Sequence, residues 1–369
     1  MAPVEGVPCL LMRGGTSKGA FFLATDLPQD PAERDGLLLR IMGTPDPRQI
    51  DGLGGAHPLT SKVAVIAPSP DGGADVEYLF LQVGVDTAFV TGRQNCGNIL
   101  AGVGPFSVER GLVPAGRGHT EVRIRMVNTN SYATARFATP GGVVDYDGDL
   151  AIDGVPGTAA AIELNFEGTA GSSTGALFPS GRVRDRVGDV DVTCVDNGMP
   201  SVLLRAADVG VTGDETPAEL EADARLAGRL AELRLAAAQL MGMGDVSGTT
   251  VPKLVLLGPP RTGGSIATRS FLPVRVHTSI GVLGALTVAA GVLADGSVGH
   301  DLAVPPPPGT PFRIEHPTGH FDVEVGVQPS GDGFDVTRSA ALRTARKIFD
   351  GLVFPRPDRD TPDRREDSP

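Results

Sequence analysis

The chain has 369 residues, of which 41% are hydrophobic and 5% are aromatic. This is enough apolar material for a sizeable core, so disorder along the whole chain is excluded and two domains are expected. The net charge of −12 disfavours nucleic acid and anionic membranes as partners, because both would repel an acidic surface.

The first half of the chain is predicted to form short strands around one glycine-rich helix. Two apolar runs at 9–12 and 20–23 flank RGGTSKG, a pattern typical of two strands joined by a turn. Asp30 and Pro31 cap a helix that we expect to end at Gly43. After NCGN, apolar residues recur at helical spacing as far as Gly111. Further strands are expected at 62–67, 76–85 and 122–127.

The second half repeats this pattern of strands around an apolar helix. Thr216, Pro217 and Glu219 open one long amphipathic helix that we expect to close at Gly242. An apolar helix is expected from about 279 to 293, a stretch too short to cross a bilayer. Strands are expected at 190–195, 201–204, 254–257, 312–314 and 321–327.

Each half therefore places one glycine-tolerant helix in the middle of a sheet, with polar residues before its N-terminus. Two such N-termini facing one site would offer free backbone N–H groups and positive dipole ends to an anion. This arrangement suits carboxylates and needs no cofactor.

Three cysteines, Cys9, Cys96 and Cys194, lie far apart in the sequence. An odd and scattered set favours a reducing cytoplasm over a disulfide framework, and the N-terminus lacks the cationic region of a signal peptide. Neither CxxC nor HExxH occurs, so no metal site is predicted. Cys9 and Cys194 lie in apolar strands and are expected in the core.

Cys96 stands in the polar turn NCGN, with Asn95, Gly97 and Asn98 around it. A helix N-terminus lowers the pKa of a thiol and improves it as an acid or base. Gly97 would let a substrate approach the backbone closely. The alternatives are a small buried cysteine at a tight turn and, last, a metal ligand.

The segment DGLGGAHPLTSKVA, residues 51–64, brings Ser61 and Lys62 to the junction of a glycine-rich loop and an apolar strand. Burial lowers the pKa of a lysine amine from about 10.4 by as much as about 3 to 5 units. A neutral amine there can take a proton from carbon. The alternative is a surface lysine at a strand edge.

Three further motifs are predicted to bind carboxylates. RGGTSKG offers Arg13, Ser17 and backbone amides, and it lacks the GxxxxGK[ST] pattern of a nucleotide site. DNGMPS, residues 196–201, is a turn between strands that contains Met199. RVHTSIG, residues 275–281, precedes the apolar helix, and the alternative is that its histidine is purely structural. The candidates in RVHTSIG are Arg275, His277, Ser279 and Gly281.

Together RGGTSKG, DGLGGAHPLTSKVA, NCGN, DNGMP and RTARKIFDG resemble the PrpF family of isomerases over residues 8–354. The resemblance implies an α+β fold of two pseudo-symmetric diaminopimelate-epimerase-like domains. Each domain would be a strongly curved, mostly antiparallel sheet wrapped round a central helix, with the active site between them. We expect domains at 1–184 and 185–354, the second ending in a helix that packs back on the first, and a disordered tail at 355–369.

The resemblance also implies an activity. Family members shift a proton along the allylic system of unsaturated di- and tricarboxylates without a cofactor, and DNGMP favours 4-oxalomesaconate from gallate or protocatechuate breakdown. The family's lysine and cysteine map onto Lys62 and Cys96. The epimerase pattern needs a second cysteine before the second central helix, where this chain reads HTSIGVLG. A proton shift served by one base is therefore expected, rather than racemisation by two thiols.

In this hypothesis Lys62 removes the proton and either Lys62 or Cys96 returns it at the other end of the allylic system. Amides near Gly97 and Gly281 would hold the enolate. Ser17, Asn98 and His277 would hold the carboxylates. A cytoplasmic enzyme is expected, with a second copy of the chain as its partner in a homodimer. The alternatives are an aconitate or methylitaconate isomerase and a non-catalytic accessory protein that binds carboxylates.

Overall fold

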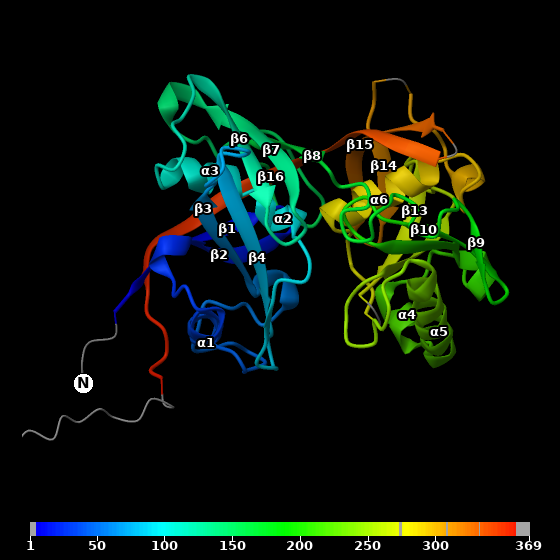
Figure 1. Cartoon of the computed structure of the whole chain (residues 1–369), viewed down its shortest axis with the longest axis horizontal. Helices are drawn as coiled ribbons and strands as arrows, with labels where there is room; N and C mark the ends of the chain where they lie inside the picture. The colour runs from blue at the N-terminus through cyan, green and yellow to red at the C-terminus, as the bar shows by residue number, and fades with distance from the viewer. Residues whose placement is uncertain (1–4, 273–274, 308, 332, 359–369) are drawn as a thin grey trace, which may run out of the picture.

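The computed structural model describes residues 5–358 except 273–274, 308 and 332. Within these residues the strands join into one sheet of sixteen strands that runs through both halves of the molecule (Figure 1). No helix in the described part of the chain is long and apolar enough to span a membrane. Most of the predicted disordered tail, residues 359–369, lies outside the described residues.

The strands of the first half form a closed ring, because β1 pairs with β2 on one side and with β16 on the other. The order around the ring is β1-β2-β3-β4-β6-β7-β8-β16, and the short β5 pairs with β4. The bounds are β1 Val7–Gly14, β2 Ser17–Leu23, β3 Lys62–Pro68, β4 Val76–Val83, β5 Val90–Thr91, β6 Gly118–Met126, β7 Ser131–Thr139, β8 Ala161–Glu167 and β16 Gly333–Val353.

From β16 the sheet continues through the second half in the order β15-β14-β13-β12-β11-β10-β9. The bounds are β9 Asp185–Val187, β10 Val190–Val195, β11 Ser201–Arg205, β12 Lys253–Gly258, β13 Ile266–Phe271, β14 Phe312–His316 and β15 Gly319–Ser330. The α-helices of the described residues are α1 Pro31–Met42, α2 Gly97–Leu100, α3 Val103–Glu109, α4 Pro217–Ala222, α5 Ala224–Leu240 and α6 Val282–Leu293.

The order of pairings in the first half recurs in the second. Strands β2 and β3 pair in parallel, as do β4 and β6, and their counterparts β11–β12 and β13–β14 are also parallel. The neighbouring pairs β3–β4 and β12–β13 are antiparallel. Helices α2 and α3 follow β4 and β5, and α6 follows β13, so each half has its apolar helix at the same point of the chain.

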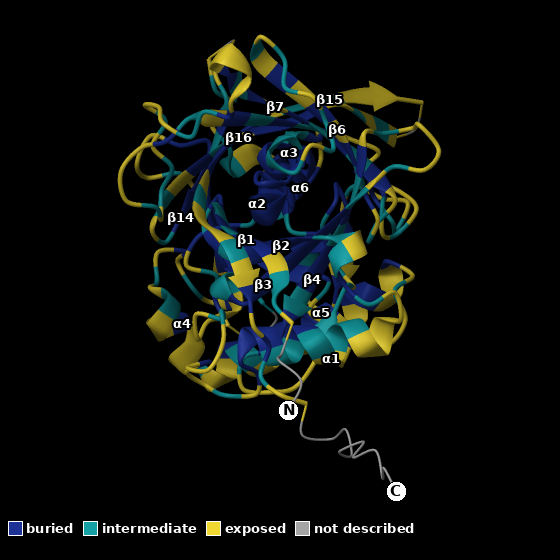
Figure 2. Cartoon of the chain, turned by 90° about the vertical axis from the view of Figure 1, so that its left-hand side faces the viewer, coloured by how far each residue is buried: buried dark blue, intermediate teal, exposed yellow. Residues whose placement is uncertain are grey.

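Helices α2, α3 and α6 are the buried helices of the described structure, and Figure 2 shows them in the interior. Ten of the twelve residues of α6 are buried, as expected for a helix that is apolar all round. Glycines allow the buried helices to approach the strands closely: a Cβ on Gly291 of α6 would lie 2.6 Å from the Cδ1 atom of Leu203 in β11. Substituting such glycines would force the packing apart.

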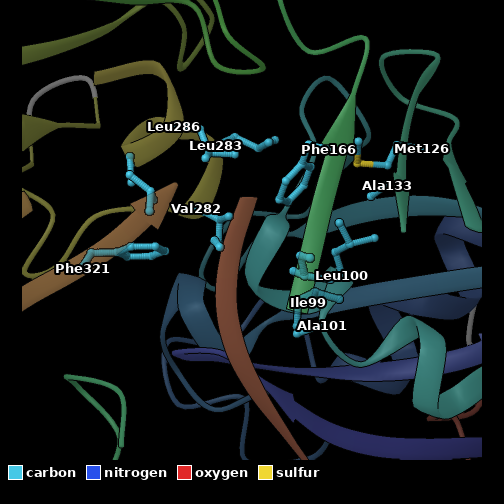
Figure 3. Close-up of a cluster of buried hydrophobic side chains, with 14 of the residues drawn as sticks. Ile99, Leu100, Ala101, Met126, Ala133, Phe166, Val282, Leu283, Leu286 and Phe321 are labelled. Atoms are coloured by element: carbon cyan, nitrogen blue, oxygen red, sulfur yellow. The ribbon is translucent and has the colours of Figure 1, made fainter. Parts of the chain in front are cut away.

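Helices α1 and α5 cover outer surfaces of the sheet. The apolar face of α1, with Leu38 and Ile41, packs with residues of β1 to β4, and that of α5, with Leu230 and Leu233, packs with β10 to β12. A larger core joins both halves, and Figure 3 shows side chains of it from each half, among them Ile99 and Leu100 of α2 and Val282 of α6.

Two sequence predictions about helices were wrong. Residues 333–353 form one long strand, β16, instead of a C-terminal helix, because pairing with β15, β8 and β1 outweighs the helix propensity of RTARK. This strand does return to the first half, where it pairs with β1 and β8, as we expected the C-terminal helix to do. The amphipathic helix after Thr216 is split at Asp223, which has extended backbone and caps α5 by accepting from the N–H of Leu226.

Candidate active site

Lys62 is the first residue of β3, and its side chain is buried, with 6% of the residue exposed. Its Nζ donates to Oε1 of Gln82 at 2.8 Å and lies 5.0 Å from the ring centre of Phe80. The Gln82 amide is itself fixed, since its Nε2 donates to the carbonyl of Ser61 at 2.9 Å. No ion pair of the described residues involves Lys62. Its burial excludes the surface-lysine alternative.

Cys96 is the N-cap residue of α2 and is half-buried. Its carbonyl accepts from the Tyr78 hydroxyl at 3.2 Å and from the N–H of Leu100 at 3.0 Å. Burial, together with the nearby Cys96 thiol, holds the pKa of Tyr78 well above its usual value. The other two cysteines, Cys9 and Cys194, are inert core residues, as expected. Burial raises the pKa of each thiol to about 12.

The N-termini of α2 and α6 meet where the two halves join. A Cβ on Gly97 would lie 2.6 Å from Cβ of Val282, the first residue of α6. Neither N-cap residue, Cys96 or Gly281, caps its helix with a side-chain hydrogen bond. We call this meeting point the junction. Helix N-termini carry unpaired N–H groups and partial positive charge, so the junction favours an anion.

Three predicted site residues carry buried polar atoms that have no hydrogen-bond partner in the described structure. These atoms are Oγ of Ser17, Oδ1 of Asn95 and Oδ1 of Asn98. The Nδ2 atom of Asn98 donates to Oγ1 of Thr16 at 3.1 Å, which fixes its amide. Because an unpaired buried polar atom costs about 1–3 kcal/mol, such atoms beside the junction are suited to a polar ligand.

Two histidines lie beside the N-terminus of α6. The N–H of Ser279 donates to Nδ1 of His277 at 3.0 Å, and the Ser279 hydroxyl lies 3.2 Å from Nε2 of His316. Burial lowers the pKa of each histidine to about 4, and for His277 the neighbouring His316, Lys62 and Lys253 add to the effect. Both rings are therefore neutral at pH 7 and act as hydrogen-bonding groups.

A family model described as PrpF protein matches residues 4–356. The chain belongs to the PrpF family. It is 55% identical to a protein of Novosphingobium sp. (strain KA1) named (4E)-oxalomesaconate Delta-isomerase, with 95% of this chain and 98% of that one covered. It is 54% identical to the 4-oxalomesaconate tautomerase of Pseudomonas putida KT2440, with 94% and 95% covered.

Solved structures agree with this assignment. A crystal structure of methylitaconate-delta-isomerase superposes with a TM-score of 0.82 at 35% identity and covers 96% of each chain. A hydroxyproline epimerase from Agrobacterium vitis superposes with a TM-score of 0.58 at 15% identity over 95% of this chain and 93% of that one, which shows the fold alone. The PrpF protein thus has the α+β fold that these isomerases and epimerases share.

Some predicted site residues of this PrpF protein are occupied in holding the scaffold. Arg13 donates to the carbonyl and hydroxyl of Thr344 at 3.1 and 2.9 Å, which ties β1 to β16. The Ser61 hydroxyl accepts from Nε2 of Gln49 at 2.8 Å. Met199 is half-buried against the main core, and Arg275 is exposed.

The DNGMP turn, residues 196–200, is a structural connection between the sheet and α6. The Asp196 carboxylate accepts from the N–H groups of Ser173, Thr174 and Gly198. Asn197 donates to the carbonyl of Leu286 in α6 at 3.2 Å. The turn therefore helps to position the helix that reaches the junction.

Several buried cations were not among the predicted site residues, and two of them are Lys253 and Arg343. Lys253, the first residue of β12, is 8% exposed. Arg343 of β16 is 5% exposed, stacks on Phe321 at 3.2 Å from the ring centre, and has an Nε atom without a partner in the described structure. The sequence carries a signal for Lys253, because it opens KLVLLG as Lys62 opens KVAVIA. Nothing distinguishes Arg343 from the other arginines of its segment.

Proposed function

We propose that this PrpF protein is an isomerase that moves a proton along the allylic system of an unsaturated tricarboxylate, 4-oxalomesaconate first among them. Relatives at 55% and 54% identity carry the names of an oxalomesaconate isomerase and tautomerase. The observation that carries the proposal is the buried Lys62 amine, which has an amide acceptor and no carboxylate partner in the described structure.

The reaction needs a single base. The amine of Lys62 takes a proton from the substrate CH₂ or CH, and the electron pair of that C–H bond spreads into an extended enolate. Either the Lys62 ammonium or the Cys96 thiol then donates a proton to the carbon at the other end of the allyl system. The double bond has moved, and no atom or electron is gained or lost.

The junction supplies the groups that stabilise the enolate and the carboxylates. The unpaired N–H groups in the first turns of α2 and α6 donate to oxygen, and the Ser17 hydroxyl is a donor that the protein leaves unused. The unpaired Oδ1 atoms of Asn95 and Asn98 only accept, so they suit an O–H group of the substrate. Losing a single donor of this kind costs about 2.7 to 4 kcal/mol in the barrier. Neutral His277 adds hydrogen bonds without competing for the proton.

We also propose that the substrate lies between two pseudo-symmetric domains, 1–184 and 185–354. Each would be a curved sheet wrapped round its buried helix. The repeated order of strand pairings and the burial of α3 and α6 support this division. Strand β16 belongs to the sheets of both halves, since it pairs with β15 and β8.

A substrate panel tests the assignment. The purified protein is mixed with 4-oxalomesaconate, aconitate and methylitaconate, and the change in ultraviolet absorbance is followed. We expect the highest kcat/KM with 4-oxalomesaconate. The second candidate is methylitaconate isomerisation, favoured by the superposition on methylitaconate-delta-isomerase. An accessory protein that only binds carboxylates would exchange no substrate hydrogen with deuterated water.

A cytoplasmic homodimer is the proposed form of the enzyme. Four apolar side chains near the end of β16 are exposed, which is unusual for such large groups and suits contact with a second copy. They are Ile348, Phe349, Leu352 and Phe354, at 50%, 43%, 52% and 63% exposed. Light scattering during size-exclusion chromatography gives the molar mass, and a mass equal to one chain would contradict the proposal.

A further inference from the structure

Lys62 and Lys253 occupy equivalent positions in the repeated order of strands. Lys62 begins β3, which runs parallel to β2 and antiparallel to β4. Lys253 begins β12, which runs parallel to β11 and antiparallel to β13. The strand before each of them begins with a buried serine, Ser17 in β2 and Ser201 in β11. The equivalent strands of the two halves, β3 and β12, thus both begin with a buried lysine.

The amine of Lys253 is buried without a counter-ion. The residue is 8% exposed, and no hydrogen bond or ion pair of the described residues involves its Nζ. Only its backbone is engaged, through an N–H that donates to the carbonyl of Pro200 at 2.8 Å. Buried lysines are normally paired with an acidic group. An unpaired one therefore destabilises the fold unless a ligand pairs with it.

The loop that leads into Lys253 is held rigidly by Arg234 of α5. Its guanidinium donates to the carbonyls of Val246, Thr249, Val251 and Pro252 at 3.0, 2.6, 2.9 and 3.1 Å. This buried cation pairs with no carboxylate of the described residues and instead holds the loop through these four carbonyls and the Thr249 hydroxyl. Such a clamp fixes where β12 begins.

The same loop reaches the first half of the molecule. The Thr250 hydroxyl donates to Oε1 of Gln94 at 3.1 Å, two residues before Cys96. Lys253 therefore lies three residues after Thr250, which contacts the segment that leads into α2. The start of β12 is held beside the junction from both sides.

The charged groups that shift the pKa of Lys253 are both positive. Burial lowers its pKa to about 7, and Arg234 of α5 and Lys62 of β3 add to the shift. Both lysines in turn lower the pKa of His277, which precedes α6. No acidic group contributes to either shift. A chain of net charge −12 therefore gathers two amines where only an anion would neutralise them.

We propose that Lys253 is a second substrate-binding residue, the counterpart of Lys62 in the second half, whose ammonium pairs with a carboxylate of the substrate. The inference rests on the proposed function and adds a residue to the same site. Pairing with an anion favours the charged amine, so Lys253 takes up a proton when the polycarboxylate binds. The proton comes from the solvent, and no covalent bond of the substrate changes in this step.

The test is a binding titration with propane-1,2,3-tricarboxylate, which has no double bond to move. Calorimetry at about pH 8, in two buffers of different ionisation enthalpy, gives the affinity and the number of protons taken up. We expect proton uptake by the wild type. Lys253→Met should bind roughly tenfold more weakly and without uptake, while Lys253→Arg keeps the affinity and loses the uptake. Unchanged affinity and uptake in Lys253→Met would overturn the inference.

Kinetics separate this role from the role of Lys62. Lys253→Met should raise KM by roughly tenfold and still exchange substrate hydrogen with deuterated water at saturating substrate. Complete loss of exchange would make Lys253 an acid or base and overturn the binding role. Lys253→Gln serves as a second variant, and circular dichroism checks that both are folded. A wild type that isomerises no unsaturated tricarboxylate would refute the proposed function. The titration tests the binding role of Lys253 separately, because propane-1,2,3-tricarboxylate binds without reacting.

Discussion

Lys62 and Lys253, which begin equivalent strands in the two halves, lie close enough for the charge of Lys62 to lower the pKa of Lys253. Bringing two buried cations together without an acid destabilises a folded protein. Proteins accept such local costs where binding or catalysis needs them. The pair therefore marks the functional site more clearly than either lysine does alone.

Cys96→Ser should weaken isomerisation without abolishing it. The Lys62 ammonium can return the proton in place of the thiol, but a hydroxyl is a much poorer acid. General acid catalysis is worth about 10²–10⁴-fold, so we expect kcat to fall by about 10²-fold. Steady-state assays of purified Cys96→Ser measure this. The buried Cys194 provides the matched control, and Cys194→Ser should leave kcat unchanged.

Gly97→Ala should destabilise the protein at the junction. The new methyl group would lie 2.6 Å from Cβ of Val282, so the two helix N-termini must separate. Overpacking of this kind costs about 1–3 kcal/mol. Urea unfolding measures the loss, and adding Val282→Gly, which removes that Cβ, should restore part of it.

Gly36 provides the control for that substitution. It lies inside α1, and a Cβ there meets nothing within 4 Å. Gly36→Ala should therefore stabilise the protein slightly, by about 0.4–1 kcal/mol. Equal effects of alanine at 36 and 97 would show that the junction is not tightly packed.

Stability should fall as pH drops from about 6.5 to about 4. His277 and His316 have pKa values lowered to about 4 by burial, so in this window the unfolded chain binds their protons and the folded chain does not. Lower pH therefore favours unfolding. Urea unfolding of wild type and His316→Gln at several pH values tests this, and the variant should show a shallower decline. A decline equally steep in His316→Gln would contradict the assignment.

Arg234→Met should raise KM as well as reduce stability. The variant leaves four loop carbonyls without their donor, and the start of β12 loses its anchor. Each unpaired buried carbonyl costs about 1–3 kcal/mol, less where water can enter. Arg229→Met on the same helix is the control, because Arg229 pairs with exposed Asp189. Such surface pairs contribute about 0–1 kcal/mol. A KM unchanged by Arg234→Met would show that the clamp does not serve the site.

Local signals in the sequence were sufficient for much of the fold. Asp30 caps α1 and Gly43 ends it in the left-handed conformation, at φ 78°, as predicted. Thr216 and Glu219 form the predicted capping box. The apolar pattern after 279 located α6, because a helix without a polar face has to be buried.

Long-range pairing was not visible in the sequence. Strand β16 contacts three other strands, and RTARK has no local feature that reveals this. The partners of Arg13 and Ser61 were missed for the same reason. Thr344 lies far from Arg13 in the sequence, and a loop separates Gln49 from Ser61. Lys253 became recognisable once the strand order showed that it matches Lys62.

The most direct measurement is hydrogen exchange at the substrate carbons in deuterated water, followed by proton NMR for the wild type, Cys96→Ser and Lys62→Ala. We predict that the wild type and Cys96→Ser incorporate deuterium at the carbon that loses its proton first. Lys62→Ala, folded as judged by circular dichroism, should incorporate none and form no product. Exchange and turnover by Lys62→Ala at rates near those of the wild type would contradict the assignment of Lys62 as the base.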